Sequence, residues 1–322
     1  MKVLVTGGAG FIGSSLTDRL VERGDEVVVV DSFDPFYAES VKRRNIKGAL
    51  ASGRVTLIES DICDTEKLQS AIEGQRVDAI VHLAARAGVR PSLERPLDYV
   101  RTNIDGTQSL LDLARRNNIR PFVLGSSSSV YGDSTPVPFS EAARADEPIS
   151  PYAATKRAAE LIAHAHAMLH GSTVACLRLF TVYGPRQRPD LAIHKFARLM
   201  MRNEKIPFYG DGGTERDYTY VADVVDGIER ALAWTIAGKP GTFDTFNLGE
   251  STTTSLAQLV ELIAREVGAT PQLERLPDQP GDVQRTFADI TKARSTFGYD
   301  PHTTMEDGIR SFVQWLRDQP AD

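Results

Sequence analysis

The first residues of the chain constrain its fold more than any other stretch. An apolar run over residues 2–6 (KVLVT) is typical of a buried strand, and Gly7, Gly10 and Gly13 follow before a helix predicted over residues 14–22. Glycines at this spacing let the backbone turn tightly and approach a pyrophosphate, while the N-terminus of the helix offers free N–H groups to that anion. The stretch predicts the βαβ unit of a dinucleotide-binding domain.

The next strand adds a cofactor preference. A second apolar run over residues 27–30 ends at Asp31, eighteen residues after Gly13, where a carboxylate can bind the diol of an adenosine ribose. The same carboxylate repels a 2′-phosphate, which favours NAD over NADP. Arg43 and Arg44 lie just downstream and leave NADP open.

Strand-like and helical runs alternate through the first 180 residues, which is typical of a parallel sheet covered by helices. Further strands are predicted over residues 55–61, 77–85, 120–126 and 173–180, and helices over 41–50, 65–73, 98–116 and 151–169. We therefore predict an α/β fold, a Rossmann-type doubly wound parallel sheet, and an NAD-binding domain over residues 1–180.

The alternation breaks from about residue 181, where Pro and Gly become frequent. Helices are predicted over residues 191–202, 222–237 and 255–267, and a last strand of the sheet near 245–248. A chain of 322 residues exceeds the size at which a single core stops growing. We predict a smaller, interleaved C-terminal substrate lobe over residues 181–322, with a segment at about 220–250 returning to the first domain.

Charge and hydropathy argue against several classes of protein. The 43 acidic and 37 basic residues give a net charge of −6, and no basic run is long enough to predict nucleic-acid binding. No apolar run approaches the ~20 residues of a membrane-spanning helix, and a strand that starts at Lys2 leaves no room for a signal peptide. The expectation is a cytoplasmic enzyme whose anionic substrates are held by local Arg and Lys residues.

Cysteine and histidine positions do not predict a metal site. Cys63 and Cys176 follow apolar residues without metal-ligand spacing, which is typical of core thiols in a reducing compartment. His164, His166 and His170 lie on one predicted helix, but no carboxylate motif such as HExxH accompanies them. We expect no metal, and a solvated or interfacial position for these histidines.

The candidate catalytic pair is Tyr152 and Lys156. Residues four apart lie on one face of a helix, so the ammonium can sit near the phenol. A fixed cation and an oxidised nicotinamide can turn a phenol of ordinary pKa ~10 into a base near neutrality. An ordinary amphipathic helix can carry the same pair. The catalytic interpretation of the pair is supported by the glycine motif and by a serine run at residues 125–132 (GSSSSVYG), which the fifth predicted strand places at the cofactor crevice.

Other positions fall at the carboxyl ends of the predicted strands, where ligands of such sheets bind. Asp61 and Ile62 end the third strand and fit the place of an adenine, and the small Ala84 and Ala85 after the fourth strand let a ribose and phosphates pass close. Asn103, inside the predicted helix 98–116, is either an amide tied to backbone or a brace for the active-site strand.

Two polar features need a choice between a structural and a functional interpretation. His82 lies within an apolar strand and is interpreted as a satisfied core histidine. Scattered arginines are usually solvated, but Arg216 and Arg285 flank the glycine turns 210–213 and 280–281, which favours bidentate binding of a diphosphate.

Together these motifs resemble the extended short-chain dehydrogenase/reductase family, and within it the nucleotide-sugar epimerase/dehydratase branch. The resemblance covers essentially the whole chain. The matching stretches are TGGAGFIG at 6–13, DI at 61–62, HLAA at 82–85, NIDGT at 103–107, SSSVYG at 127–132, YAATK at 152–156, RDYTYVADV at 216–224 and PGDV at 280–283.

The resemblance implies an NAD cofactor, a UDP-sugar substrate and a homodimer formed through the helices near 98–116 and 151–169. It implies that Ser127 bonds the reacting sugar oxygen, that Tyr152 is the base, and that Lys156 binds the nicotinamide ribose and lowers the pKa of the phenol. The positions implied to contact NAD are Gly7, Gly10, Phe11, Ile12, Gly13, Asp31, Ser32, Asp61, Ile62, Leu83, Ala84, Ala85, Asn103, Tyr152 and Lys156. Those implied to contact the substrate are Arg90, Ser127, Ser128, Thr181, Arg186, Lys195, Arg216 and Arg285.

The serine run also bears on the reaction. Dehydratases of this branch place an Asp-Glu pair before the Val-Tyr-Gly, and its decarboxylases a Glu at the second of these positions, whereas this chain has Ser128 and Ser129. A 4-keto sugar then has no catalyst for elimination, and the remaining course is return of the hydride. The resemblance therefore implies C4 epimerisation, with the cofactor regenerated in each turnover.

The sugar is implied by the loops. Galactose epimerases generally have Asn where this chain has Thr181, and residues 177–190, 87–90 and 34–37 are similar to the UDP-glucuronate 4-epimerases. Hydroxyls of Ser127, Ser128 and Thr181, with Arg186, are expected to hold a C5 carboxylate out of alignment with the C4 carbonyl. UDP-glucose or UDP-N-acetylglucosamine remains open as the substrate, as do decarboxylation or dehydration and, in a different class, a non-catalytic NAD-binding sensor.

Overall fold

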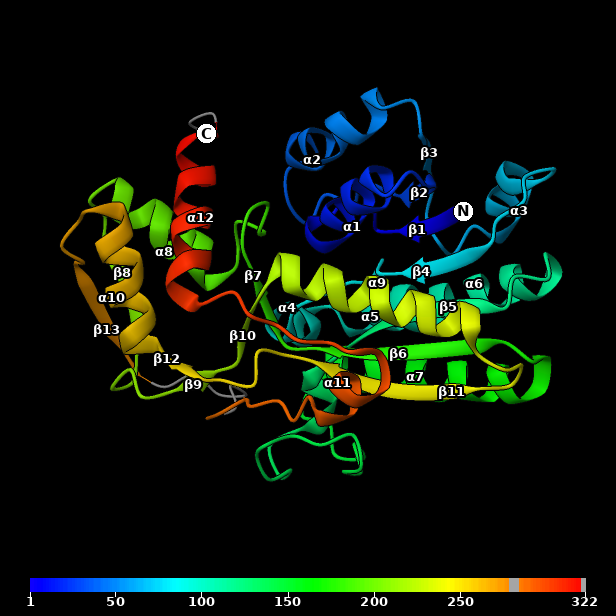
Figure 1. Cartoon of the computed structure of the whole chain (residues 1–322). Helices are drawn as coiled ribbons and strands as arrows, with labels where there is room; N and C mark the ends of the chain where they lie inside the picture. The colour runs from blue at the N-terminus through cyan, green and yellow to red at the C-terminus, as the bar shows by residue number, and fades with distance from the viewer. Residues whose placement is uncertain (278–283, 320–322) are drawn as a thin grey trace.

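A seven-stranded parallel sheet forms the centre of the molecule (Figure 1). The computed structural model describes residues 1–277 and 284–319. The strand order is β11-β6-β5-β4-β1-β2-β3, which runs outward in both directions from β1 and confirms the predicted doubly wound, Rossmann-type sheet. The strands are β1 (Lys2–Thr6), β2 (Glu26–Asp31), β3 (Val55–Glu59), β4 (Ala79–His82), β5 (Pro121–Ser127), β6 (Thr173–Leu179) and β11 (Phe243–Leu248).

Helices cover both faces of the sheet, each over its own apolar core. One face is covered by α1 (Phe11–Glu22), α2 (Glu39–Ala51) and α9 (Val221–Ala237), which contribute buried residues such as Leu16, Ile46 and Ile228. The other is covered by α3 (Thr65–Ile72), α6 (Gly106–Arg116) and α7 (Pro151–His170), with Leu68, Leu111 and Ala163 among the buried residues. The all-apolar β2 core (VVVV) fits a strand that is buried on both sides.

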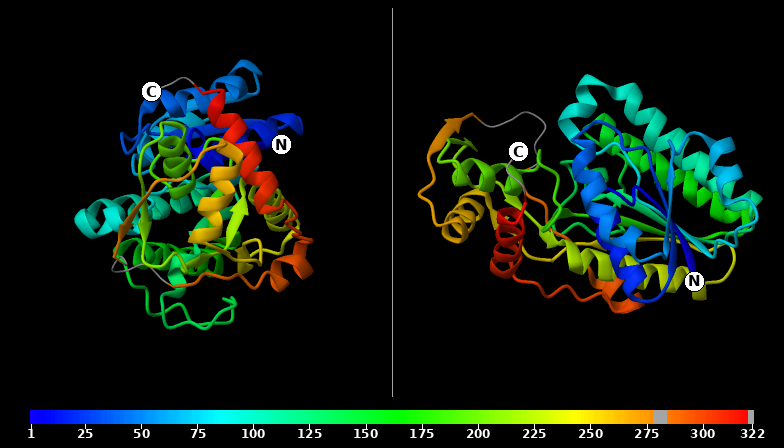
Figure 2. Two further views of the ribbon diagram at one scale, coloured as in Figure 1. Left: turned by 90° about the vertical axis from the view of Figure 1, so that its left-hand side faces the viewer. Right: turned by 90° about the horizontal axis from the view of Figure 1, so that it is seen from above.

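A smaller lobe with a third core lies at one end of the sheet, as the two further views in Figure 2 show. Its helices are α8 (Ala192–Met201), α10 (Leu256–Val267) and α12 (Met305–Arg317), which pack through Phe196, Ile263 and Phe312. Short strand pairs accompany these helices. They are β7 (Thr181–Tyr183) with β10 (Tyr218–Tyr220), β9 (Glu215–Arg216) with β12 (Thr254–Ser255), and β8 (Ile206–Tyr209) with β13 (Leu273–Leu276).

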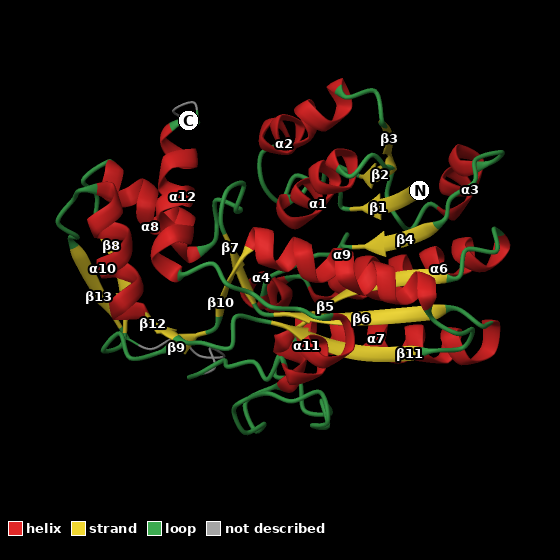
Figure 3. Cartoon of the chain, viewed as in Figure 1, coloured by secondary structure: helices red, strands yellow, loops and turns green. Residues whose placement is uncertain are grey.

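The two parts are interleaved along the chain (Figure 3). After α8 and β8 in the smaller lobe, the chain returns to the sheet with α9 and β11. It then leaves again for α10 and β13, packs α11 (Thr291–Phe297) beside β11, and ends with α12 in the lobe. The predicted last strand near 245–248 is thus an edge strand of the sheet, paired in parallel with β6.

The glycine loop begins its helix earlier than predicted. Helix α1 starts at Phe11, with Gly10 at its N-cap, because the glycine turn itself already aims the backbone into the first helical turn. Gly7 has a φ of +69°, and a Cβ added to Gly13 would lie 2.1 Å from the carbonyl oxygen of Gly7. A side chain at position 13 would therefore push the helix off the strand.

The structure divides the single helix predicted over 98–116. It contains α5 (Pro96–Val100), a π-helical turn η1 (Arg101–Asp105) and α6. Within η1, the side chain of Asn103 bonds to neighbouring elements, and π turns of this kind often occur at functional sites. A further short helix, α4 (Val89–Glu94), lies between β4 and α5.

Histidines and cysteines take structural positions. His82 is buried and bonded to Thr6 and Thr107 at 2.8 and 3.1 Å, which confirms its interpretation as a core residue. The two cysteines are free thiols, Cys176 buried and Cys63 half-buried. Among residues 1–277 and 284–319, no cluster of three metal-ligating side chains occurs and no helix is long and apolar enough to cross a membrane. His166 is buried, so the predicted solvated face holds for His164 and His170 but not for it.

Candidate active site

A cavity of about 770 Å³ lies at the carboxyl ends of the strands. Its walls come from both parts of the molecule: the glycine loop and the segments after β2, β3, β4 and β5 on one side, and β7 with the loop after it on the other. This is the crevice in which open α/β sheets bind ligands. Its size suits a dinucleotide together with a second ligand.

Most of the residues predicted to contact the dinucleotide line this cavity. The predicted cofactor residues that line the cavity are Gly7, Gly10, Phe11, Ile12, Gly13, Asp31, Ser32, Asp61, Ile62, Leu83, Ala84, Ala85, Tyr152 and Lys156. No side chain caps the N-terminus of α1, so its first N–H groups stay available to an anion. The Asp31 carboxylate accepts hydrogen bonds from the N–H groups of Ala9 and Phe33, which fixes it beside the glycine loop. These residues fit an adenine dinucleotide.

Asn103 does not line the cavity. Its side chain accepts a hydrogen bond from the backbone N–H of Arg86 at 2.8 Å and donates to the carbonyl of Arg86 at 3.0 Å. It also donates to the hydroxyl of Thr155, between the two candidate catalytic residues of α7, at 3.0 Å. The brace interpretation is thereby supported and direct cofactor contact is not: Asn103 ties the loop after β4 to α7.

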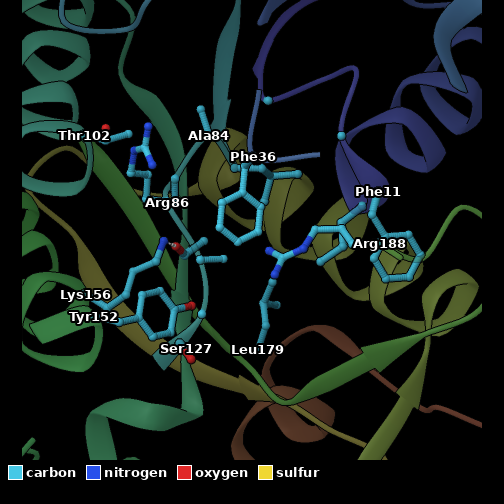
Figure 4. A pocket seen from close by; sticks show the side chains of 18 of the residues that line it. Phe11, Phe36, Ala84, Arg86, Thr102, Ser127, Tyr152, Lys156, Leu179 and Arg188 are labelled. Atoms are coloured by element: carbon cyan, nitrogen blue, oxygen red, sulfur yellow. Dashed lines mark hydrogen bonds between the residues drawn. The ribbon is translucent and has the colours of Figure 1, made fainter. Parts of the chain in front are cut away.

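Local chain geometry places the candidate catalytic residues together (Figure 4). Ser150 caps α7 by accepting the N–H of Ala153, so the helix starts at Pro151 and directs Tyr152 and Lys156 into the cavity. Strand β5 ends at Ser127, which caps the short 3₁₀ helix η2 (Ser128–Tyr131) by accepting the N–H of Ser129 at 3.2 Å. Ser127 and Tyr152 both line the cavity, and Ser127 is among the groups that lower the pKa of the Tyr152 phenol.

Burial sets the pKa values of the pair. Burial raises the pKa of the Tyr152 phenol, while its hydrogen bond with Ser127 and the positive charge of Arg188 act in the opposite direction. Burial lowers the pKa of Lys156 to about 8. The Lys156 ammonium donates to the carbonyl of Gly125 at 2.7 Å. In this structure, therefore, the groups that lower the phenol pKa are Ser127 and Arg188, and the predicted effect of Lys156 on it is not seen, because the ammonium points at the strand.

On the substrate side, the structure brings together only part of the predicted set. Ser127, Ser128, Thr181 and Arg216 line the cavity. The PGDV stretch at 280–283 lies outside the described residues.

Four predicted substrate cations lie elsewhere. Arg90 has its guanidinium over the ring of Tyr209, 5.6 Å from its centre, and Lys195 is exposed on α8. Arg285 pairs with Glu215 at 2.8 Å, and Arg186 pairs with Asp18 of α1 at 2.6 Å. None of the four lines the cavity. For Arg186 the reason is a φ of +69°, which turns its side chain toward α1.

Arg188 takes the place in the cavity that was predicted for Arg186. It is held by two hydrogen bonds to Asp190, at 3.0 and 2.7 Å, with its guanidinium 5.0 Å from the ring centre of Phe36. Figure 4 shows Arg188 and Phe36 directed into the cavity on the side opposite Tyr152 and Lys156. The sequence signal was the GPRQRPD segment at 184–190, from which only Arg186 was predicted to contact the substrate.

A second charged contact that the sequence did not predict closes the other side of the cavity. Asp34, after β2, pairs with Arg86, after β4, at 2.7 Å, and both line the cavity. Tyr37 and Lys42 follow in the same wall, and burial raises the pKa of the Tyr37 phenol. The segment 34–37 was noted for its similarity to relatives, but the pairing of its aspartate needs the fold to be seen.

A Rossmann-type sheet whose carboxyl-end crevice is lined by a Ser at a strand end and by a Tyr with a Lys one helical turn on defines a short-chain dehydrogenase/reductase. The family model described as GDP-mannose 4,6 dehydratase matches residues 4–312. The chain therefore belongs to the nucleotide-sugar epimerase/dehydratase family of extended short-chain dehydrogenases/reductases.

Three known proteins are similar to this chain over 98% of its length. The UDP-glucuronate 4-epimerase of Thermodesulfobacterium geofontis is 37% identical over 98% of this chain and 96% of its own length. The UDP-glucuronate 4-epimerase 2 of Arabidopsis thaliana is 40% identical over 98% of this chain and 75% of its own. The crystal structure of the Bacillus cereus UDP-glucuronic acid 4-epimerase, in complex with UDP-glucuronic acid and NAD, superposes with a TM-score of 0.91 at 33% identity and covers 98% of this chain and 99% of that one.

Proposed function

We propose that this protein is an isomerase, an NAD-dependent UDP-sugar 4-epimerase, and that its substrate is UDP-glucuronate, converted to UDP-galacturonate. The observation that carries the proposal is the cavity in which Ser127, Tyr152 and Lys156 meet the glycine loop without an added acid beside them. Full-length similarity to UDP-glucuronate 4-epimerases supports the same substrate. The cofactor is NAD, which the cradle of Gly7, Gly10 and Gly13 and the carboxylate of Asp31 fit.

The chain's own residues supply acid–base work and orientation. Ser127 holds the 4-hydroxyl of the sugar, and the Tyr152 phenolate removes its proton and later returns it. Lys156 lines the cavity beside this pair and binds the nicotinamide ribose. NAD, when bound, takes up the hydride of C4 and gives it back. Return to the opposite face of the 4-keto sugar inverts C4.

The carboxylates of the cavity wall support return of the hydride rather than elimination. Asp31, Asp34, Asp61 and Asp98 line the described wall, and each is already engaged by another group. Asp34 pairs with Arg86, Asp61 with Arg101 and Asp98 with Arg95, while Asp31 accepts two backbone N–H groups. Ser128 and Ser129 stand at the positions of the dehydratase acids, and among the described residues of the wall every carboxylate already has another partner.

We further propose that Arg188 holds the C5 carboxylate, with the hydroxyls of Thr181 and Ser128 beside it. Its side chain is 16% exposed and its guanidinium faces the cavity. Oxidation at C4 makes a β-keto acid, which loses CO₂ when the bond to its carboxylate aligns with the carbonyl π system. A carboxylate held by a fixed guanidinium stays out of that alignment.

The test is incubation of the purified protein with UDP-glucuronate, without added NAD, followed by NMR identification of the sugar product. UDP-galacturonate is the expected product, because the cofactor stays bound and is regenerated. UDP-pentose as the main product contradicts the proposal. A parallel panel of UDP-glucose and UDP-N-acetylglucosamine decides between substrates, and an absence of turnover with all three leaves a non-catalytic NAD-binding protein.

We also propose the division of labour and the assembly. Residues 1–180, with the returning segment at about 220–250, bind NAD, and residues 181–322 form the lobe that binds the UDP-sugar. A homodimer through α6 and α7 and their surroundings is supported by the exposed apolar Leu97, Leu161 and Leu169, at 78%, 55% and 76% exposure. A cytoplasmic location accords with this chemistry. Light scattering of the purified protein tests the dimer.

A further inference from the structure

A row of polar side chains crosses the sheet directly below the candidate active site. Ser126 of β5, Arg178 of β6 and Asn247 of β11 are register partners, so their side chains lie on the same face. They are 4%, 3% and 0% exposed. A guanidinium is costly to bury unless it is paired and hydrogen-bonded. A row of this kind inside an apolar sheet therefore needs an explanation beyond packing.

Glu160 of α7 closes the row. Its carboxylate accepts hydrogen bonds from Ser126 at 2.6 Å, from Arg178 at 3.0 and 2.8 Å, and from Arg157 at 3.0 Å. The side chain is 1% exposed. Burial raises its pKa, but pairing with Arg178 outweighs burial and holds the pKa below its ordinary value, so the carboxylate is charged.

The placement of Glu160 follows the helix repeat that organises the site. Tyr152, Lys156 and Glu160 are successive residues at a spacing of four, on one face of α7. They meet three consecutive residues at the end of β5. Lys156 donates to the carbonyl of Gly125, Glu160 accepts from Ser126, and Ser127 lowers the pKa of the Tyr152 phenol.

The other end of the row anchors the segment after Ser127. Asn247 accepts the hydroxyl of Tyr131, the last residue of η2, at 2.7 Å and donates to the carbonyls of Phe139 and Asp289 at 2.8 and 3.0 Å. The Arg178 guanidinium lies 4.6 Å from the ring centre of Tyr131. The row thus fixes η2 as well as α7.

We propose that Glu160 and Arg178 are a positioning pair for catalysis, which sets Lys156 and Tyr152 of α7 against Ser127 of β5. The inference rests on the proposed epimerase function for its catalytic consequence. Neither residue touches substrate or cofactor, because neither lines the cavity. Their role is to lock the separation and register between α7, β5 and β6, and a displacement of reacting groups by about 1 Å can cost on the order of 10²-fold in rate.

The charges around Lys156 support this role. His82 faces it from β4, Cys176 from β6, Glu160 from its own helix, and Tyr152 one turn away. Burial raises the pKa of the Cys176 thiol well above its ordinary value and lowers that of His82 to about 3, so both are neutral near pH 7. Glu160 is then the nearby anion that keeps Lys156 protonated against the effect of burial.

The test replaces both charges at once, with Glu160→Met and Arg178→Met in one chain. Replacing a buried ion pair by apolar residues of similar size is often neutral for stability, so the melting temperature is expected to stay close to that of the parent chain. We expect kcat to fall about 10–100-fold, with KM for the UDP-sugar changed by less than about 3-fold. The alkaline limb of the pH profile is expected to move to lower pH, because Lys156 loses its supporting anion.

A second readout does not depend on turnover. The ultraviolet tyrosinate titration of the protein, minus that of its Tyr152→Phe variant, reports the Tyr152 phenol. In the double variant its midpoint is expected to rise by about 1 pH unit, because a displacement of α7 from β5 weakens the effect of Ser127 that lowers the pKa of the phenol. A parent chain that converts no UDP-sugar contradicts the proposed function, while this titration still tests the positioning pair. A folded double variant with unchanged titration and unchanged kcat overturns the pair.

Milder and matched variants keep the test decisive. If the double variant does not fold, Ser126→Ala removes one hydrogen bond from Glu160 and is expected to shift the titration in the same direction by less; no shift overturns the proposal. Asp25→Asn is the control. Asp25 is a buried carboxylate that pairs with Arg23 and the N-terminus at the other end of the sheet, so its loss is expected to lower stability without moving the Tyr152 titration.

Discussion

The cavity has a cofactor wall, formed by the glycine loop and the segments after β2, β3, β4 and β5, and a substrate wall, formed by β7 and the loop after it. The sequence predicted the residues of these two walls from different kinds of feature. On the cofactor wall, Gly13, Asp31 and Ala84 act through backbone shape or through a carboxylate fixed at a strand end. On the substrate wall, the groups are long cationic side chains on loops. All but one of the residues predicted for the cofactor line the cavity, whereas Arg90, Lys195 and Arg285 do not line it. The end of a strand fixes where a side chain lies, whereas the backbone dihedral angles of a loop decide in which direction a side chain points.

Arg186 and Arg188 show this difference within three residues. Both are arginines of one loop, but the left-handed backbone at Arg186 directs it to Asp18, and Arg188 enters the cavity beside Phe36. On the substrate wall, the direction of an arginine side chain therefore depends on which acidic partner lies within its reach.

The largest effect is expected on the cofactor wall. Tyr152→Phe removes the proton acceptor while leaving the ring against Tyr99, whose centre is 6.2 Å away. We expect turnover to fall about 10²–10⁴-fold, the usual weight of a general base. Bound NAD, measured after denaturation of the protein, should stay unchanged. Turnover like that of the parent chain would remove Tyr152 from the mechanism.

The next effect is expected to separate the two arginines. Arg188→Ala should lower kcat/KM for UDP-glucuronate about 10–100-fold, since a hydrogen-bonded charge contributes roughly 1.5–3 kcal/mol, and should release some UDP-pentose. Arg186→Ala, the matched control, should change it by less than about 3-fold, because Arg186 does not line the cavity and pairs instead with Asp18 of α1.

A substrate lacking the carboxylate sharpens the same comparison. If Arg188 acts through the carboxylate, Arg188→Ala should affect UDP-glucose turnover less than UDP-glucuronate turnover. An equal loss with both would show that Arg188 acts through the Tyr152 phenol, whose pKa its charge also lowers. Equal losses for Arg186→Ala and Arg188→Ala would break the contrast itself.

A smaller effect is expected from pH. The ammonium of Lys156 has a pKa lowered to about 8, so it is charged below that pH and neutral above it. We expect kcat/KM to decline as the pH rises through about 8, since the charged ammonium that is proposed to bind the nicotinamide ribose is lost. Measured profiles should show this alkaline limb, and Lys156→Arg, which stays charged, should lack it. A profile flat to about pH 10 would contradict this assignment.

The smallest effect is expected for Glu250, which follows β11. Burial, together with Asp223 and Asp217, raises the pKa of Glu250 to about 7. A carboxyl whose folded pKa lies above its unfolded value favours folding at low pH, and this contribution is lost as the pH rises through about 7. Glu250→Gln should therefore reduce the fall in melting temperature between pH 6 and pH 8.5 by about 2 °C. An unchanged fall would show that Glu250 is not the responsible group.

Part of the fold escaped sequence reasoning for a physical reason. The helix predicted over 98–116 has a continuous helical pattern, yet Asn103 forms a π turn there because its amide bonds to Arg86 and Thr155, which come from other elements. The polar row of Ser126, Arg178 and Asn247 is likewise invisible in sequence, since its members lie on three strands that become neighbours only in the sheet.

The sequence by itself determined the parallel sheet, the glycine loop with Asp31 at the end of the next strand, and the placement of Tyr152 and Lys156 on one helix face. These follow from local rules, namely apolar periodicity, glycine conformations and a four-residue spacing on one helix, whereas the predicted role of Ser127 came from the family resemblance. Tertiary structure alone decided which arginine enters the cavity, that Asn103 is a brace, and that Glu160 meets Arg178 below the site. Those outcomes depend on contacts between segments distant in the chain, whose geometry exists only once the sheet is assembled.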